Sequence, residues 1–283
     1  MVLAGQDAGG AQPSLAQALN AALRFKAGTA PDALETYIAA CRTPASFAEF
    51  VGALLQTDYW AGRALPDTAA ALKTACLGLA AAIDVAAHGV DEPAYHCRRH
   101  FKEVCLGLSL LLAGAGWPIS DEDAWILLLA AIGHDYGHEG RPNHRFGELE
   151  EKSCGLVADY LQRHPGVDVA AQERVAALIR ATEPSLYSAV TGPYAAGADL
   201  STLETMKILL VEADLFASML PEYGILLGNW LSEEFRAEAP QVAQVIASPA
   251  GRLGFLKAHP YVSPNSKALN FGSVIESAVA KSG

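Results

Sequence analysis

The sequence predicts an all-α protein. Long segments rich in Ala and Leu place apolar residues at helical spacing, whereas the strict alternation of Val, Ile and aromatic residues that is typical of strands is hard to find. Of the 283 residues, 51% are hydrophobic and 18% are charged, which is enough apolar chain to bury a sizeable core. We expect about eight or more helices.

Several helix boundaries are legible in the sequence. Two serines, each with an acidic residue three positions on, predict capping boxes at the start of apolar helices: Ser120 with Asp123, and Ser201 with Glu204. Gly and Pro predict that helices end at 114–118, 164–166 and 191–193.

The chain is expected to form a single helical domain, because no repeat and no linker rich in Gly, Ser or Pro divides it. Helices within 1–90 would pack on a core formed by 91–262, and 263–283 would be a C-terminal tail. Small and polar residues predict that the first dozen residues and the last few are loose.

Charge and cysteine content bound the partners. Lys and Arg number 20 and Asp and Glu 31, a net charge of −11, which argues against a nucleic acid polymer. The N-terminal residues lack the pattern of a secretory signal, and the 5 cysteines include no CxxC pair, so a reduced, cytoplasmic protein is expected. The nearest candidate for a membrane span, 69–87, is interrupted by Lys73 and Asp84, so no membrane is expected as a partner.

Histidines and aspartates at three places predict a metal centre. His96 and His100, four apart, would share one helical face and reach one pocket; the alternative is a solvated face. His134 and Asp135 follow a strongly apolar helix, where an unpaired carboxylate is costly unless a proton or a cation neutralises it. Asp214 interrupts another apolar helix face; the alternative is a salt bridge to a core arginine.

These residues outline a hydrolytic centre. Imidazole with carboxylate suits zinc, manganese or iron, and His100, His134, Asp135 and Asp214 supply two of each from three helices. Two divalent ions would lower the pKa of a bridging water and polarise a phosphoryl oxygen. His96 is then free to protonate a leaving oxygen.

The order of motifs resembles the HD superfamily, and within it the catalytic domain of class I 3′,5′-cyclic nucleotide phosphodiesterases. The resemblance runs from Tyr95 to Tyr261. YHCRRHFKEV is similar to the family's YHNxxHAxDV, HDYGHEG to HDxxHPG, LEE from Leu149 to LEN, and LIRATE to LxATD. Further on, VEADLFASM is similar to CADLSN, the segment ending WLSEEF to W…EEF, and RLGFLKAHPY to QVGFIDYIVHP.

This resemblance implies a compact all-α HD-domain fold and a role for each matching residue. The four ligands would hold the first metal, zinc or iron, and Asp135 would bridge to a second, magnesium or manganese. A hydroxide between the two metals would attack phosphorus, and His96, the general acid, would release a 5′-monophosphate. Three further residues would position the waters of the second metal and the hydroxide: His138, Glu150 and Thr182. Three would line the substrate pocket: Tyr95, Arg252 and Phe255. Of these, Phe255 would stack on the base.

At two positions that contact the purine in the family, this sequence has a different residue. Arg252 stands where the family has a glutamine, and Ala217 where an asparagine often contacts adenine. A guanidinium only donates hydrogen bonds. Arg252 therefore suits an anionic or acceptor-rich group, or it pairs with a local acid and shapes the wall. A small phosphodiester other than a purine cyclic nucleotide remains an alternative substrate.

Two further alternatives lie outside hydrolysis. Some HD proteins hold two irons and activate oxygen, usually with additional histidine ligands, for which this chain offers only His88, His144, His164 and His259. A sensor that binds a nucleotide without turning it over is the other, although it would have no need of His96. A homodimer is expected only from its general frequency.

Overall fold

The computed structural model describes residues 13–24, 31–64, 67–164 and 166–282. These residues form sixteen α-helices, two short 3-10 helices and no strand, so the all-α prediction is confirmed. The first half of the chain contains α1 (Leu15–Leu23), α2 (Pro31–Cys41), α3 (Phe47–Leu54), α4 (Asp58–Ala61), α5 (Asp67–Ala87), α6 (Arg98–Ala113) and α7 (Asp121–Gly133). The second half contains α8 (Glu148–Gln162), α9 (Val169–Arg180), η1 (Pro184–Leu186), α10 (Tyr187–Ala195), α11 (Thr202–Leu215), η2 (Ala217–Met219), α12 (Tyr223–Phe235), α13 (Pro240–Ile246), α14 (Pro249–Ala258), α15 (Pro264–Ala268) and α16 (Phe271–Ser282).

The predicted helix starts are correct, with one difference in their caps. Ser201 and Glu204 form the reciprocal capping box. Ser120 caps α7 by accepting the backbone N–H of Asp123, but the Asp123 carboxylate bonds the Ser120 hydroxyl instead of returning to the Ser120 backbone. The side chain of Asp is one methylene shorter than that of Glu, the residue that a capping box prefers.

Two of the three predicted stops hold, since α6 ends at Ala113 and α8 at Gln162. The stop at 191–193 is wrong, because Pro193 lies inside the last turn of α10. A proline so close to a helix end removes a single backbone hydrogen bond, and α10 ends two residues later.

Three helices form the centre of the molecule. In α6, every residue from His100 to Leu112 is buried, and in α7 every residue from Ala124 to Gly133 is buried. α11 is buried from Thr205 to Ala213 except at Lys207, and it packs against both. These three helices carry the histidines and aspartates of the predicted metal centre, which therefore lies inside the protein's best-packed region.

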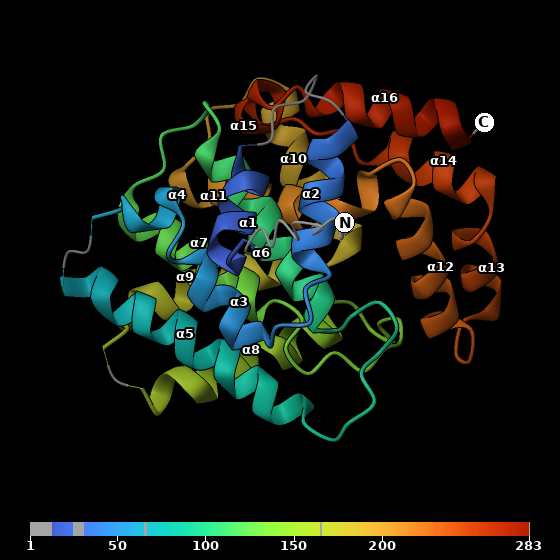
Figure 1. Cartoon of the computed structure of the whole chain (residues 1–283). Coiled ribbons are helices and arrows are strands. Elements are labelled where there is room, and N and C mark those ends of the chain that lie inside the picture. The colour runs from blue at the N-terminus through green and yellow to red at the C-terminus, as the bar shows by residue number, and fades with distance from the viewer. Residues whose placement is uncertain (1–12, 25–30, 65–66, 165, 283) are drawn as a thin grey trace, which may run out of the picture.

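Helix α5 lies along the lower edge of the view in Figure 1 and packs against α3 and α7. Its window Ala70–Ala87 is long and apolar enough to cross a membrane by length and composition, despite its two charged residues, and it is the one such helix among the described residues. Leu72, Cys76 and Leu79 on one face of α5 are buried in the core, and core helices of folded domains meet the same criteria.

The C-terminal helices α12, α13, α14 and α16 gather at the right of Figure 1. The expectation that the last residues are loose is wrong as far as Ser282, because α16 packs against α14 and η2. Phe271 at its start is fully buried and stacks on Phe216 with ring centroids 4.1 Å apart. The expectation for the first dozen residues lies outside the described part of the chain.

Candidate active site

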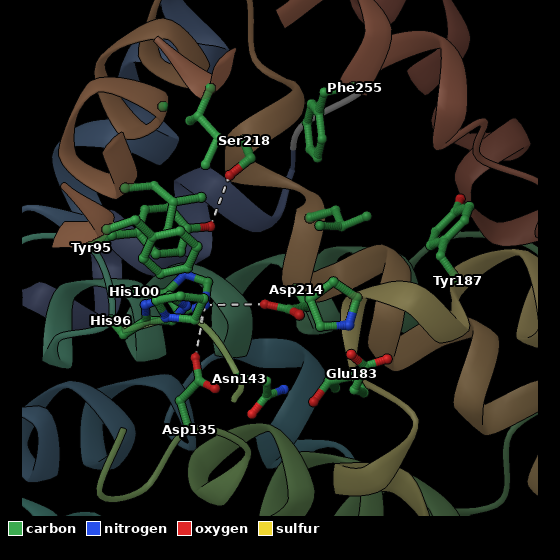
Figure 2. Close-up of a pocket in the computed structure, with 18 of the residues that line it drawn as sticks. Tyr95, His96, His100, Asp135, Asn143, Glu183, Tyr187, Asp214, Ser218 and Phe255 are labelled. Carbon is green, nitrogen blue, oxygen red and sulfur yellow. Dashed lines mark hydrogen bonds and ion pairs between the residues drawn. The ribbon is translucent and has the colours of Figure 1, made fainter. Parts of the chain in front are cut away.

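A cavity of about 380 Å³ opens between the central helices and the C-terminal helices. Its wall brings together most of the residues that the sequence singles out: Tyr95, His96, His100, Asp135, His138, Glu150, Thr182, Asp214, Arg252 and Phe255. His134 lies directly behind this wall and is 1% exposed. Figure 2 shows Asp135 and Asp214 on two sides of His100, with Phe255 and Tyr187 farther along the cavity.

The four predicted metal ligands, hereafter the tetrad (His100, His134, Asp135 and Asp214), come from the ends of the three central helices. His100 lies in the first turn of α6, His134 caps the C-terminus of α7 with Asp135 next to it, and Asp214 lies in the last turn of α11. Gly133 lets α8 approach this point, because a Cβ there would lie 2.5 Å from a methyl carbon of Val157.

The donor atoms of the tetrad converge on one point. His100 Nε2 lies 3.1 Å from Asp214 Oδ1 and 3.4 Å from Asp135 Oδ2. His134 Nε2 lies 3.1 Å from the same Asp135 oxygen, 3.6 Å from the Asp214 oxygen and 3.3 Å from His100 Nε2. Four ligands about 2.0–2.1 Å from a tetrahedral zinc ion would lie about 3.3 Å apart. His100, His134 and Asp214 therefore form a group that could hold one metal ion, and Asp135 lies beside both imidazoles.

Both imidazoles present Nε2 because a group behind each ring faces Nδ1. His134 Nδ1 donates to the carbonyl oxygen of Ala131 (2.9 Å). His100 Nδ1 faces Glu103 Oε2 at 3.6 Å, and neither of these buried atoms has a hydrogen-bond partner. A carbonyl or carboxylate behind a ligating histidine is the usual arrangement in metal sites, since it fixes the tautomer and the ring orientation.

Opposite charges within the tetrad stabilise each other. Burial opposes charge on all four side chains, but contact with Asp135 and Asp214 raises the pKa of His134 to about 10. In the same way, burial is outweighed by hydrogen bonds from His100 and His134, which lower the pKa of Asp214 to about 2. The cluster is a site for positive charge, whether protons or a divalent cation supply it.

His96 lies before α6, not on it. α6 begins at Arg98, so the expected placement of His96 one helical turn from His100 is wrong. Glu234 on α12 accepts the backbone N–H groups of Tyr95 (2.7 Å) and His96 (3.1 Å) and bonds His96 Nδ1, which holds this segment in a turn. The pocket prediction still holds, because the ring centroids of His96 and His100 are 5.9 Å apart.

His96, His138 and Glu234 form a second group that could hold a metal ion. The ring of His138 stacks on that of His96 with centroids 3.6 Å apart, and its Nδ1 lies 3.9 Å from Glu234 Oε1. Burial, together with the charge of His96, lowers the pKa of His138 to about 3. His138 is therefore neutral at physiological pH, and the backbone N–H of Gly140 donates to its Nδ1 (3.1 Å).

The opposite wall of the pocket is rich in oxygen atoms. Thr182, Glu183 and Glu150 line it, and Asn143 donates to Glu150 Oε2 (2.9 Å). Burial raises the pKa of Glu150, Asn143 counteracts this, and the neighbouring Asp135 and Glu183 raise it again. Such a surface suits a hard divalent cation and its water ligands.

At the other end of the pocket, Arg252 and Ala217 differ from what the sequence predicts. Arg252 does not pair with an acid among the described residues; its terminal nitrogens donate to the carbonyl oxygens of Ser218 and Leu220 (3.0 Å for the latter). Burial lowers the pKa of Arg252 to about 10. Ala217 is 2% exposed and does not line the pocket, whereas Phe255 does, with its ring centroid 5.7 Å from the guanidinium carbon.

Sequence reasoning missed four polar residues of the site: Glu103, Asn143, Glu183 and Glu234. Glu103 and Glu234 are carboxylates on largely apolar helices, the same signal that identified Asp214, and Glu234 lies in a segment that carries the family resemblance. Asn143 has no comparable signal, because it lies in the loop before α8, and its partners Leu149 and Glu150 lie on that helix.

No family model and no curated protein matches this chain, but solved structures do. Two are phosphodiesterase domains from the choanoflagellate Salpingoeca rosetta, one titled rhodopsin phosphodiesterase and one RhoPDE fusion protein. Both are 17% identical, with TM-scores of 0.57 and 0.59; they cover 92% and 96% of this chain and 90% and 94% of their own. The third, LmjPDEB1 in complex with IBMX, is 16% identical with a TM-score of 0.63, over 99% of this chain and 98% of that one. The chain has the fold of these phosphodiesterase domains along nearly its whole length.

Proposed function

We propose that this chain is a metal-dependent phosphodiesterase that converts a 3′,5′-cyclic nucleotide to its 5′-monophosphate. The observation that carries the proposal is that His100, His134 and Asp214 form a group that could hold a metal ion, with Asp135 beside both imidazoles, and that a further imidazole, His96, lines the same pocket and bonds the carboxylate of Glu234. The phosphodiesterase fold of the chain supports the same chemistry, although fold alone does not assign a reaction.

The tetrad would hold zinc or iron, and Asp135, which has two oxygens, would extend to magnesium or manganese beside the oxygen-rich wall. Bound there, the two ions would supply a nucleophile from water near neutral pH and polarise the phosphoryl group. Glu103 and Ala131 hold the two imidazoles with Nε2 toward the metal.

His96 would protonate the departing ribose oxygen. Because Glu234 accepts the proton on Nδ1, the proton on Nε2 is the one available for transfer. Burial opposes the Glu234 charge, but the bonds with the side chain and backbone of His96 and with the backbone of Tyr95 lower the carboxyl pKa, so Glu234 stays ionised and accepts from His96 Nδ1. Neutral His138, stacked on His96, adds no competing positive charge.

The di-iron oxygenase has no observation in its favour. Of the four remaining histidines only His259 lines the pocket, and it belongs to neither group of side chains that could hold a metal among the described residues. His144 pairs with Glu238, and His164 donates to the carbonyl oxygen of Tyr160.

Product analysis by chromatography tests the proposal. Manganese-loaded protein should convert cyclic AMP or cyclic GMP to the 5′-monophosphate and also cleave an activated aryl phosphodiester. Asp214→Asn should lose both activities with the circular dichroism spectrum unchanged, while Asp199→Asn, at an exposed position, should lose neither. Full activity of Asp214→Asn would contradict the site, and a 3′-monophosphate product would contradict the assignment of the leaving oxygen.

A further inference from the structure

The pocket end around Phe255, made by Gly224, Val245, Gly251, Arg252 and Phe255, offers little that could read the edge of a bound base. Three of its five members have no polar side-chain atom because they are glycine or valine, and Phe255 presents an aromatic ring. Arg252 is the one charged side chain of this end, and it is 9% exposed.

The guanidinium of Arg252 is already committed to the protein. Its two terminal nitrogens donate to the carbonyl oxygens of Ser218 and Leu220, and its Nε is buried without a partner. Gly224 closes the other side, because a Cβ there would lie 2.4 Å from Nη2. Arg252 thus joins α14 to the turn after Asp214 and has no freedom to swing toward a ligand.

The neighbouring polar side chains also make hydrogen bonds within the protein. The hydroxyls of Tyr95 and Ser218 bond each other (2.9 Å), as Figure 2 shows. The Tyr187 hydroxyl donates to the carbonyl oxygen of Pro260 (2.6 Å). His259 donates through Nδ1 to the carbonyl oxygen of Phe255 and packs its ring between Tyr187 and Phe255, with both centroid distances 4.7 Å.

We infer that this pocket holds the base of a cyclic nucleotide by apolar contact with Phe255 and hydrolyses cyclic nucleotides irrespective of their base. The inference rests on the proposed function and names its substrate class. The N–H groups left on Arg252 can only donate, and every nucleobase offers an acceptor, so a contact with them does not separate one base from another. Among the described residues that line the pocket, the one amide is Asn143, and it bonds Glu150 and the backbone N–H of Leu149.

The ratio of kcat/KM values between cyclic nucleotides that differ in their base tests this inference. Apolar pockets separate related ligands by roughly 10- to 200-fold, whereas sites that hydrogen-bond a ligand group reject its analogues by about 10⁴-fold or more. We therefore expect kcat/KM values for cyclic AMP, cyclic GMP and cyclic CMP to agree within about 100-fold. A preference for one of them of more than about 200-fold would overturn the inference.

Two comparisons complete the experiment. An activated aryl phosphodiester without a base reports on the metal centre alone. If it is cleaved while one cyclic nucleotide is strongly preferred over the others, only the inference fails. If it is cleaved while no cyclic nucleotide is, the proposed function fails together with the inference, and only the metal centre stands. If nothing is cleaved, the proposed function fails with it. Arg252→Met, which removes the tie to the 218–220 turn, should lower the rates for all three nucleotides by a common factor. A change in their ratio of about tenfold or more would show that Arg252 reads the base.

Discussion

Replacing Glu234 with glutamine isolates the role of His96. Glu234 Oε2 accepts two backbone N–H groups, at 2.7 and 3.1 Å, and Oε1 bonds His96 Nδ1. In Glu234→Gln the remaining oxygen would keep the two backbone bonds, which leaves the amide NH₂ against Nδ1. An NH₂ group donates, so it cannot accept the proton on Nδ1 and no longer holds the ring with its Nε2 proton toward the substrate.

The expected loss is that of general-acid catalysis. Proton transfer by a positioned side chain contributes about 10²- to 10⁴-fold, or about 3 to 5 kcal/mol of barrier. We expect kcat for a cyclic nucleotide, whose leaving group is a poor one, to fall by that factor. An activated aryl phosphodiester needs no proton at its leaving oxygen, so its kcat should change by no more than about threefold.

The assay is steady-state turnover of both substrates by the wild type, Glu234→Gln and Glu233→Gln. Glu233 is the exposed neighbour on α12, and its substitution is the matched control. An equal loss for both substrates would mean that Glu234 supports the metal centre or the fold rather than the acid. An unchanged cyclic nucleotide rate would refute His96 as the proton donor.

Three other substitutions test separate parts of the structure. Glu103→Gln removes the carboxylate behind His100 and should weaken zinc affinity, measured by chelator competition, by about 10- to 100-fold, with partial rescue by Glu103→Asp. Asp84 is partly buried, which raises its pKa, but backbone N–H groups at the start of α3 and an arginine lower it below 3.8. Its stabilisation is therefore complete above that pH and is lost as the pH falls through the folded-state pKa. Asp84→Asn should lower the free energy of unfolding in urea by about 1–2 kcal/mol at pH 7 and by less at pH 3. Gly224→Ala should destabilise the protein by about 1–3 kcal/mol, since its Cβ would lie 2.4 Å from Arg252, whereas a helical glycine with free space around it would gain about 1 kcal/mol; a raised melting temperature would contradict the close approach.

The tetrad could be predicted from the sequence because the signal for each aspartate lies in its own segment of the chain. A carboxylate that interrupts a buried apolar helix needs a cation or a proton, and Asp135 and Asp214 could be recognised on that ground alone. The chemistry of imidazole and carboxylate then grouped them with His100 and His134. His100 and Asp214 lie within helices, and His134 and Asp135 directly follow one, so the predicted helices place each of them near its position in the structure.

The sequence could not predict contacts made by residues far apart in the chain. His96 and His100 have helical spacing, but Glu234, 138 positions away from His96, takes the backbone N–H groups before α6 and keeps His96 outside the helix. The state of Arg252 was open for the same reason, since its partners are carbonyl oxygens, which leave no trace in the sequence.

The central claim is that the tetrad holds a metal on which phosphodiester cleavage depends. The most direct test adds zinc and then manganese back to chelator-stripped protein, with bound metal measured by elemental analysis and turnover measured in the same samples. Turnover should rise with metal occupancy, and Asp214→Asn, with its fold intact, should neither retain zinc nor turn over. Full turnover by the stripped protein, or normal zinc binding by Asp214→Asn, would contradict the claim.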